Sequence, residues 1–321
     1  MILVTGGTGF IGSHVLEKLS SSGVPARCLL RPRNRPATLP AGIEPAFGDL
    51  STGHGLAEAL RGITALIHLA GVTKALRKEE FYSGNVRATE TLLHAVAGRE
   101  IRLVHVSSLA AIGPSRDGTP VGEDDPPGPI THYGKSKLEA ERLVRKLTPQ
   151  AVIVRPPVVY GPRDTDVFQL LKSISQGLVL EIAGGERWFS AIYVTDLVDG
   201  LLAAANCPRA TGRTYFLAHP KPNTWTDLSS TAARIMACRP SVLRAPVPVA
   251  YSLGFAAEIW SRITRKPGIV SREKIREARC RWWMCDTRRA AAELGFQATT
   301  PLDTGLSLAL AWYKEAGWLK W

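Results

Sequence analysis

Met1-Ile2-Leu3-Val4-Thr5-Gly6-Gly7-Thr8-Gly9-Phe10-Ile11-Gly12 reads as a strand, a glycine-rich turn and the start of a helix. Residues 1–4 are an apolar run typical of a buried parallel strand, and apolar residues then recur at helical spacing at Phe10, Ile11, Val15, Leu16 and Leu19. We expect Gly6 to permit the turn, Gly9 to let a diphosphate approach the backbone, and Gly12 to let the helix pack closely. The alternative is a tight turn without a ligand.

A second motif, Tyr133-Gly134-Lys135-Ser136-Lys137, supplies candidate chemistry. Tyr133 and Lys137 are four residues apart, which places them on one face of a helix. Proton transfer near neutral pH requires the pKa of a phenol to fall by roughly 3 units, on the order of 4 kcal/mol. A lysine ammonium and a hydroxyl donor favour that fall, and Ser108 is the candidate hydroxyl. The three side chains predict a proton relay, with a surface Tyr–Lys pair as the alternative, and the Gly-, Pro- and Asp-rich residues 113–129 predict a loop over the site.

Strand and helix patterns alternate through the first half of the chain. Apolar runs predict strands near residues 26–30, 45–48, 65–69, 103–107 and 151–155. They indicate an α/β fold with a doubly wound parallel sheet. After Tyr160 the alternation weakens, and proline and glycine recur. We expect a Rossmann domain over residues 1–160, with residues 182–204 returning to it, and a smaller, mostly helical substrate-binding part built from residues 161–181 and 205–321.

Further motifs follow one another along the chain in a fixed order. They are Thr5 to Gly12, Gly48-Asp49-Leu50, His68-Leu69-Ala70-Gly71, Asn85-Val86 with Thr89, Ser107-Ser108, Tyr133 to Lys137, and Arg155-Pro156-Pro157-Val158-Val159-Tyr160-Gly161-Pro162. With these motifs the chain resembles the extended short-chain dehydrogenase/reductases, which form the NAD-dependent epimerase/dehydratase family. The resemblance covers most of the chain.

The resemblance implies roles for individual residues. Tyr133 would be the general acid or base, Ser108 the catalytic hydroxyl, and Lys137 would lower the pKa of Tyr133 and hold the nicotinamide ribose. Asp49 would bind the adenine edge, or else be a simple helix-start residue ahead of Ser51 and Thr52. The implied cofactor-binding set is Gly6, Gly9, Phe10, Ile11, Arg31, Asp49, Leu50, Leu69, Ala70, Gly71, Asn85, Ser107, Tyr133, Lys137 and Pro156.

Arg31 decides which nicotinamide cofactor we expect. An acidic side chain at the end of the second strand accepts hydrogen bonds from the ribose 2′-hydroxyl, whereas an arginine accommodates a 2′-phosphate. The strand ends at Leu29-Leu30-Arg31, and Arg33 and Arg35 follow. The sequence therefore predicts NADP in preference to NAD.

The substrate class follows from departures from the family pattern. Leu109-Ala110 stands where the dehydratase branch has an Asp-Glu pair, which argues against dehydration. Val158 and Phe189-Ser190 stand where sugar-nucleotide enzymes carry diphosphate-binding Asn and Arg-Asp residues, and the anion would lose those charge-assisted bonds. The chain is thus closer in character to the 3-beta-hydroxysteroid dehydrogenase and dihydroflavonol reductase branch. We expect an NAD(P)-dependent oxidoreductase that interconverts a secondary alcohol and a ketone on an apolar or cyclic substrate bound by Ser108, Val158 and Phe189.

Two other functions stay open at this point. One is a nucleotide-sugar 4-epimerase, in which the same three catalytic residues oxidise and re-reduce one carbon with a tightly held cofactor. The other is a non-catalytic, cofactor-binding structural subunit or assembly factor, because relatives of the family serve that way. Ser108, Tyr133 and Lys137 argue against this last function, since a structural protein need not retain them.

Composition limits the partners. The formal charge is +12, and basic residues concentrate between Arg262 and Arg281. This excess is typical of a solvated face, and the alternative is attraction to anionic lipid through residues 246–281, where large apolar side chains accompany the arginines. No nucleic-acid-binding motif accompanies the charge, so we expect no nucleic acid partner. The family resemblance implies a homodimer.

The cysteines and the first residues indicate a compartment. Five cysteines, at positions 28, 207, 238, 280 and 285, match neither a disulfide framework nor a zinc spacing, so we expect reduced thiols and no metal. The first strand begins at Met1 without a leader, and no apolar run reaches the roughly 20 residues of a spanning helix. We expect a cytoplasmic enzyme.

Overall fold

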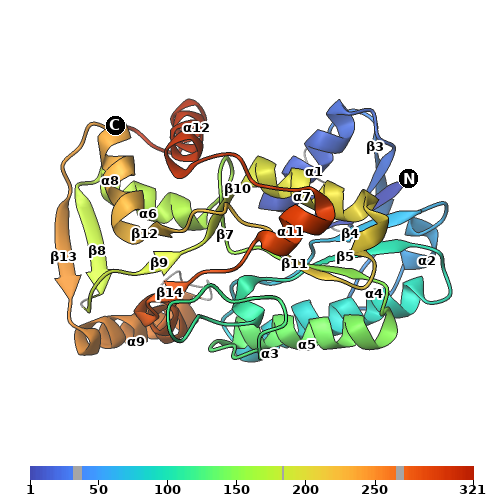
Figure 1. Ribbon diagram of the computed structural model, residues 1–321, viewed down its shortest axis with the longest axis horizontal. Helices are drawn as coiled ribbons and strands as arrows, with labels where there is room; N and C mark the ends of the chain where they lie inside the picture. The colour runs from blue at the N-terminus through green and yellow to red at the C-terminus, as the bar shows by residue number, and fades with distance from the viewer. Residues whose placement is uncertain (32–37, 183, 265–270) are drawn as a thin grey trace.

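A seven-stranded parallel sheet forms the centre of the computed structural model, which describes residues 1–31, 38–182, 184–264 and 271–321 (Figure 1). The strand order is β11-β6-β5-β4-β1-β2-β3. The strands are β1 (Ile2–Thr5), β2 (Ala26–Leu30), β3 (Ile43–Phe47), β4 (Ala65–His68), β5 (Arg102–Val106), β6 (Val152–Arg155) and β11 (Thr214–Phe216). The order reverses between β1 and β4, which makes the sheet doubly wound and confirms the predicted fold class.

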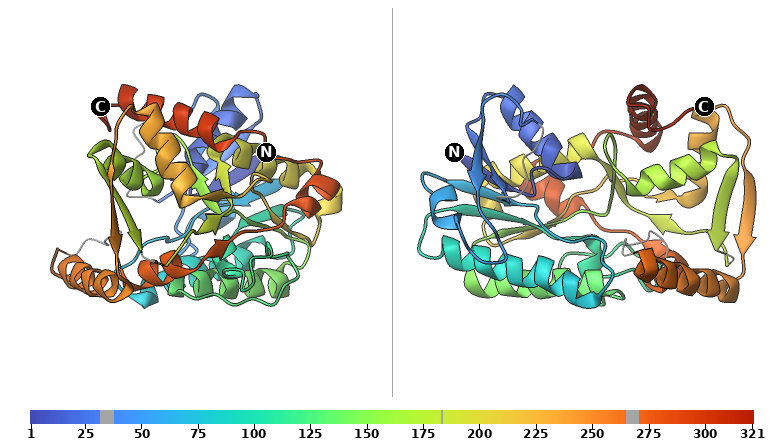
Figure 2. Two further views of the ribbon diagram at one scale, coloured as in Figure 1. Left: turned by 60° about the vertical axis from the view of Figure 1, so that its left-hand side comes forward. Right: turned by 180° about the vertical axis from the view of Figure 1, so that it is seen from behind.

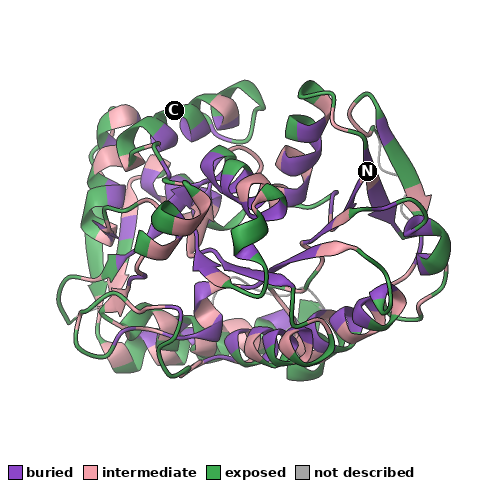
Figure 3. Ribbon diagram, turned by 45° about the vertical axis from the view of Figure 1, so that its right-hand side comes forward, coloured by how far each residue is buried: buried purple, intermediate pink, exposed green. Residues whose placement is uncertain are grey.

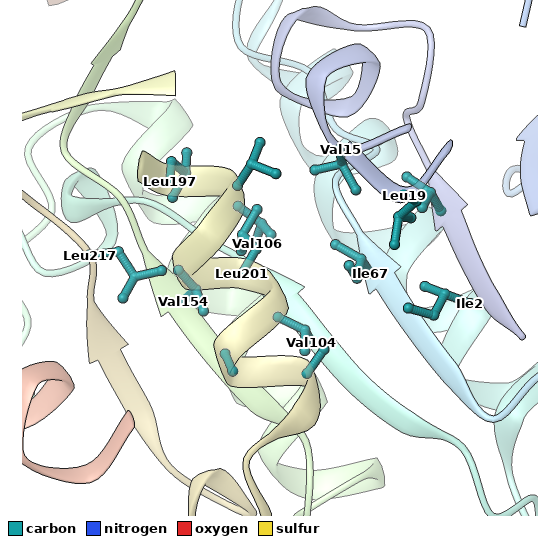
Figure 4. Close-up of a cluster of buried hydrophobic side chains, with 14 of the residues drawn as sticks. Ile2, Val15, Leu19, Ile67, Val104, Val106, Val154, Leu197, Leu201 and Leu217 are labelled. Atoms are coloured by element: carbon teal, nitrogen blue, oxygen red, sulfur yellow. The ribbon is translucent and has the colours of Figure 1, made fainter. Parts of the chain in front are cut away.

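Helices cover both faces of this sheet, because successive side chains of a strand point to opposite sides. Ile2 and Val4 of β1 join one core cluster with α1 (Phe10–Ser21) and α7 (Val194–Asn206) (Figure 4). Leu3 joins the opposite cluster, to which helices α2 (Leu56–Ala59), α4 (Ala88–Val96) and α5 (His132–Leu147) contribute. The central strands, such as β1 and β6, are buried on both sides, whereas the edge strand β3 is mostly exposed (Figure 3). Each fully buried Leu or Val stabilises the fold by about 1.5–3 kcal/mol.

A second core holds the smaller part together. Its aromatic centre includes Phe168, Phe189 and Tyr313, from elements far apart in the chain. The helices of this part are α6 (Asp166–Ser175), α8 (Trp225–Ile235), α9 (Val247–Thr264), α10 (Arg272–Arg279) and α12 (Leu302–Glu315). Its strands are β7 (Val158–Tyr160) with β10 (Ala191–Tyr193), β9 (Trp188–Phe189) with β12 (Asn223–Thr224) and β14 (Trp282–Trp283), and β8 (Leu178–Ile182) with β13 (Ser241–Ala245). None of the described helices, α9 included, combines the length and apolar character needed to cross a bilayer.

The division between the two parts differs from the predicted one in two places. β11 lies within residues 205–321, which were assigned to the substrate-binding part, yet it pairs with β6 at the edge of the central sheet. β10 lies within residues 182–204, which were expected to return to the sheet, yet it pairs only with β7 in a separate two-stranded sheet. That segment still packs on the central sheet, through α7 and through Ile192 of β10. Such short strands are assigned by their pairing partners, which local sequence patterns do not specify.

Candidate active site

The glycine-rich turn leaves no space for side chains where the chain reverses. Gly6 has φ +72°, and a Cβ on it would lie 2.7 Å from the Ala70 amide nitrogen. A Cβ on Gly12 would lie 2.1 Å from the Gly6 carbonyl oxygen, so α1 packs directly on the turn. Gly9 is the N-cap of α1 without a side-chain cap, which leaves the first N–H groups of the helix to a ligand. This turn fits the diphosphate of a dinucleotide, with Phe10 and Ile11 half-buried at the start of the helix.

A second side of the site consists of the three residues that follow β4, which are Leu69, Ala70 and Gly71. The Ala70 amide donates to Thr5 Oγ1 at 3.2 Å, and Leu69 packs against the core. A Cβ on Gly71 would lie 2.8 Å from Asn85 Oδ1. These contacts hold the backbone of this segment beside the glycine-rich turn.

Asn85 connects this segment to α5 through hydrogen bonds. It lies in the π-helical segment η1 (Tyr82–Arg87) and is buried. Its Oδ1 accepts from the Val72 amide at 2.7 Å, and its Nδ2 donates to Ser136 Oγ at 2.9 Å. Asn85 therefore acts as a positioning residue, because both ends of its amide are engaged by the protein.

Ser108 and Tyr133 meet where the end of β5 faces the first turn of α5. Thr131 caps α5 by accepting from the Gly134 amide at 3.1 Å. A Cβ on Gly134 would lie 2.2 Å from the carbonyl oxygen of Ala110, so only glycine lets α5 pack on the turn that follows Ser108. The Ser108 hydroxyl accepts from the Ala110 amide at 3.1 Å and lies close enough to the Tyr133 phenol to lower its pKa. The structure thus brings these two predicted residues together.

Burial raises the pKa of the Tyr133 phenol in the protein without cofactor. The neighbouring Ser108 hydroxyl and the charge of Lys274 only partly oppose this rise. The expected fall in pKa relies in part on the positive charge of a bound nicotinamide, so it stays a prediction. A phenol with a raised pKa stays protonated near neutral pH, which is the form that donates a proton.

Lys137 is buried one helical turn after Tyr133. Its Nζ donates to the Val106 carbonyl oxygen at 2.7 Å. Burial lowers the pKa of the ammonium to about 8, although Glu141 raises it. An ammonium held in this way favours a negatively charged or hydroxylated partner nearby. That Lys137 lowers the pKa of Tyr133 stays a prediction.

Lys274 is a site residue that the sequence did not reveal. It lies on α10, whose Glu273 Oε1 accepts from the His132 amide at 3.0 Å and whose Arg276 donates to the Ile130 carbonyl oxygen at 3.2 Å. These bonds fasten α10 to the start of α5 and bring the Lys274 charge near Tyr133. The only signal was the concentration of charge between residues 262 and 281, which carries no motif.

Arg31 and Asp49 lie together at the ends of neighbouring strands. Arg31 is exposed after β2. Hydrogen bonds from the Ser51 amide and hydroxyl, at 2.8 and 2.7 Å, lower the pKa of Asp49, and the Arg31 charge adds to this. Asp49 therefore caps the turn formed by residues 50–52. The helix-start alternative is wrong, because the next helix, α2, begins at Leu56 with Gly55 as its N-cap. Leu50 is half-buried against the core. Arg33 and Arg35 lie outside the described residues.

The predicted substrate residues Val158 and Phe189 differ in how far they are buried. Val158 is half-buried on β7, at the border of the second core. Phe189 is only 1% exposed and stacks on the Trp225 ring at 4.4 Å, so its assignment to the substrate is wrong in this structure. Its pairing with Trp225 was not visible in the sequence.

Two other predicted cofactor residues, Ser107 and Pro156, are buried beside the end of β5. Pro156 accepts from the Leu109 amide at 2.9 Å, so it fixes the turn that carries Ser108. The Ser107 hydroxyl has no hydrogen-bond partner among the described residues. A buried hydroxyl of this kind calls for a partner, which a bound ligand could supply.

Comparisons with known proteins agree with this geometry. The model of the NAD dependent epimerase/dehydratase family matches residues 2–218. A ceramide reductase of Caulobacter vibrioides is 30% identical over 320 residues, covering 99% of this chain and 96% of the relative. A 4-hydroxy-2-methyl-3-oxo-4-farnesyl-3,4-dihydroquinoline-1-oxide ketoreductase of Stigmatella aurantiaca is 33% identical over 228 residues, or 68% of each chain. The structure of MoeE5 with UDP-glucose and NAD superimposes with a TM-score of 0.79 at 26% identity, covering 98% of this chain and 99% of that one.

Proposed function

This chain belongs to the NAD-dependent epimerase/dehydratase family, and on that premise we propose that it is an NADP-dependent oxidoreductase that interconverts a ketone and a secondary alcohol on an apolar, lipid-like substrate. The observation that carries the proposal is the close packing of the first turn of α5, which holds Tyr133, on the turn that follows Ser108, with Lys137 buried one turn further along α5. This arrangement suits proton transfer at one substrate oxygen.

Each side chain has a separate task in this mechanism. A nicotinamide dinucleotide, when bound, supplies or accepts the hydride at the substrate carbon. In reduction Tyr133 donates its proton to the ketone oxygen, and in oxidation it takes the proton from the alcohol. Ser108 orients that oxygen by hydrogen bonding. Lys137 provides a fixed positive charge that stabilises the phenolate left after the proton has moved.

The names of two relatives support reduction as the working direction. The Tyr133 phenol is protonated near neutral pH, which is the form that donates a proton to a ketone oxygen. The related proteins from C. vibrioides and S. aurantiaca are named as reductases. Oxidation would require the same phenol to lose its proton first.

The substrate class is supported by what surrounds the catalytic turn. Leu109 is buried in an apolar cluster where a dehydratase would place an acid, and Val158 stands where a diphosphate-binding amide would. The two named reductases act on ceramide and on a farnesylated quinoline oxide. Leu109 and Val158 cannot donate hydrogen bonds to an anion, so they suit an apolar substrate better than a sugar nucleotide.

The choice of NADP is supported by Arg31. Its exposed guanidinium lies near Asp49, at the edge of the sheet where the adenine ribose of a dinucleotide would bind. A 2′-phosphate there would receive charge-assisted hydrogen bonds from the guanidinium. NAD carries only a neutral 2′-hydroxyl there, so it lacks the negative charge that would pair with the guanidinium.

A 4-epimerase acting on a sugar nucleotide is the second candidate, and the similarity to MoeE5 bound to UDP-glucose favours it. Such an enzyme would keep its cofactor and show no net turnover of it. The remaining alternative, a purely structural subunit, has no support in the comparisons, since the relatives described above are enzymes.

Nicotinamide absorbance tests the proposal. Purified protein is given NADPH with long-chain ketones or sterol ketones in mixed micelles, and UDP-sugars are tested separately for isomerisation. We expect NADPH consumption with an apolar ketone, lost in Tyr133→Phe and kept in Tyr82→Phe, a matched change of another half-buried tyrosine that lies near the start of α5. Isomerisation of a UDP-sugar without NADPH consumption would replace the proposal by the epimerase.

A further inference from the structure

Helix α9 packs with its small residues inward. Ala250, Gly254 and Ser261 are its buried positions. A Cβ on Gly254 would lie 2.3 Å from Ile275 Cδ1 of α10 and 3.3 Å from the Arg272 amide nitrogen, so α9 and α10 lie close together at this glycine. The packing of α9 onto the protein therefore uses almost none of its apolar side chains.

Its large apolar side chains point outward instead. Val249, Leu253, Trp260 and Ile263 are 49%, 60%, 67% and 69% exposed, and they recur at helical spacing along one stripe. Phe255 and Ile259 extend this surface. None of the exposed side chains that the structure describes on α9 is charged. A helix facing only water normally carries charged residues there, so this face is built for an apolar environment.

Positive charge borders this outward face. The Arg272 guanidinium lies over the Phe255 ring at 5.1 Å, and that of Arg279 lies over the Tyr251 ring at 5.7 Å. Two half-buried carboxylates of α9 and α10 are paired with basic side chains. Glu258 pairs with Arg272 at 2.9 Å, and Glu277 pairs with Lys274 at 2.8 Å. In sequence, residues 247–281 contain eight Lys and Arg against three Glu.

We propose that the outward face of α9, with the basic residues of α10 beside it, docks the protein onto the surface of an anionic lipid bilayer. The apolar side chains enter the boundary between headgroups and acyl chains, and the arginines bind lipid phosphates. A second copy of the chain fits this surface less well. A symmetric interface would bring two cationic borders together, and like charges repel.

The docking helix is mechanically linked to the active site. α9 packs on α10, and α10 is hydrogen-bonded to residues 130 and 132 at the start of α5, one residue before Tyr133. α9 also lies along the same lower edge of the molecule as α3 (Lys78–Phe81) and α5 (Figures 1 and 2). Docking would therefore hold the catalytic end of α5 near the bilayer. Delivery of a lipid by this route rests additionally on the proposed function, whereas docking itself does not.

Co-sedimentation with vesicles tests docking without cofactor or substrate. The vesicles contain phosphatidylcholine alone or mixed with phosphatidylglycerol. The variants are Trp260→Glu, Arg279→Glu and the control Leu308→Glu, which changes a 50% exposed leucine on α12, at the opposite edge of Figure 1. We expect binding to the anionic vesicles, a fall in the partition constant of about ten-fold or more for Trp260→Glu, a smaller and salt-dependent fall for Arg279→Glu, and no change for Leu308→Glu.

Three results would overturn the proposal. They are no binding of the unaltered protein to anionic vesicles, equal losses in Trp260→Glu and Leu308→Glu, and a dimer in light scattering that Trp260→Glu dissociates. The last result would assign the face to a second copy. Thermal unfolding of each variant verifies that it is folded, and NADPH oxidation with a detergent-dispersed ketone, measured separately, keeps a failure of docking distinct from a failure of the proposed function.

Discussion

Replacing Lys137 by methionine should stabilise the cofactor-free protein while abolishing turnover. Burial holds the pKa of this ammonium at about 8, against an ordinary value of 10.5. That difference corresponds to about 3 kcal/mol against the charged form near neutral pH. Methionine removes this cost at similar volume but leaves the buried Val106 carbonyl without its donor, a loss of about 1–2 kcal/mol. The net gain is about 1–2 kcal/mol, or about 2–3 °C in Tm for a chain of this size.

The pH dependence of this gain identifies its cause. Because the folded pKa lies below the unfolded one, the unfolded chain binds more protons between about pH 8 and 10.5, and stability rises with pH in that window. Lys137 therefore lowers the free energy of unfolding by its full amount below pH 8 and by less at higher pH. The difference in stability between Lys137→Met and the unaltered protein should decrease toward pH 10. Thermal unfolding at about pH 7 and pH 9.5 measures this, with Lys135→Met, an exposed lysine on the same helix, as the control. A less stable variant at pH 7, or an advantage independent of pH, would refute the reasoning.

Three further substitutions test other parts of the account. Arg31→Asp should lower the ratio of NADPH to NADH affinity by about ten-fold or more, because it replaces a phosphate partner with a like charge; fluorescence titration with both cofactors measures this, and an unchanged ratio would contradict the NADP assignment. Gly12→Ala should abolish dinucleotide binding and lower Tm, because its Cβ would lie 2.1 Å from the Gly6 carbonyl oxygen; normal binding in the same titration would show that the turn is not the site. Glu141→Gln should cost about 3–5 kcal/mol in urea unfolding, because it strips the buried Arg155 of a carboxylate held at 2.9 and 2.7 Å; a cost below 1 kcal/mol would mean that the pair is neutral to stability.

The features that the sequence predicted are those set by local chemistry. A buried parallel strand needs a continuous apolar run, and β2 occupies residues 26–30 as expected. A turn with positive φ and no room for a Cβ needs glycine, which made Gly6 recognisable. The pair Tyr133 and Lys137 followed from helical spacing, and Ser108 from the motif order of the family.

The features that were missed depend on contacts between distant segments. Lys274 reaches the site because α10 binds the start of α5, more than a hundred residues earlier in the chain. Phe189 is withdrawn from the substrate because Trp225 stacks on it. Helix α9 turns its small residues inward because Gly254 faces Ile275 of α10, a contact that the sequence does not show. Neither spacing nor composition encodes which partner a side chain meets.

Deuterium transfer tests the central claim most directly. The protein is incubated with NADPH that carries deuterium at both C4 positions and with the apolar ketone that gives the fastest NADPH oxidation. Mass spectrometry then measures the deuterium content of the alcohol product. The account predicts one deuterium on the carbinol carbon, with a rate about 10²–10⁴-fold lower in Tyr133→Phe. A product without deuterium, or full transfer in Tyr133→Phe, would contradict hydride transfer assisted by this tyrosine.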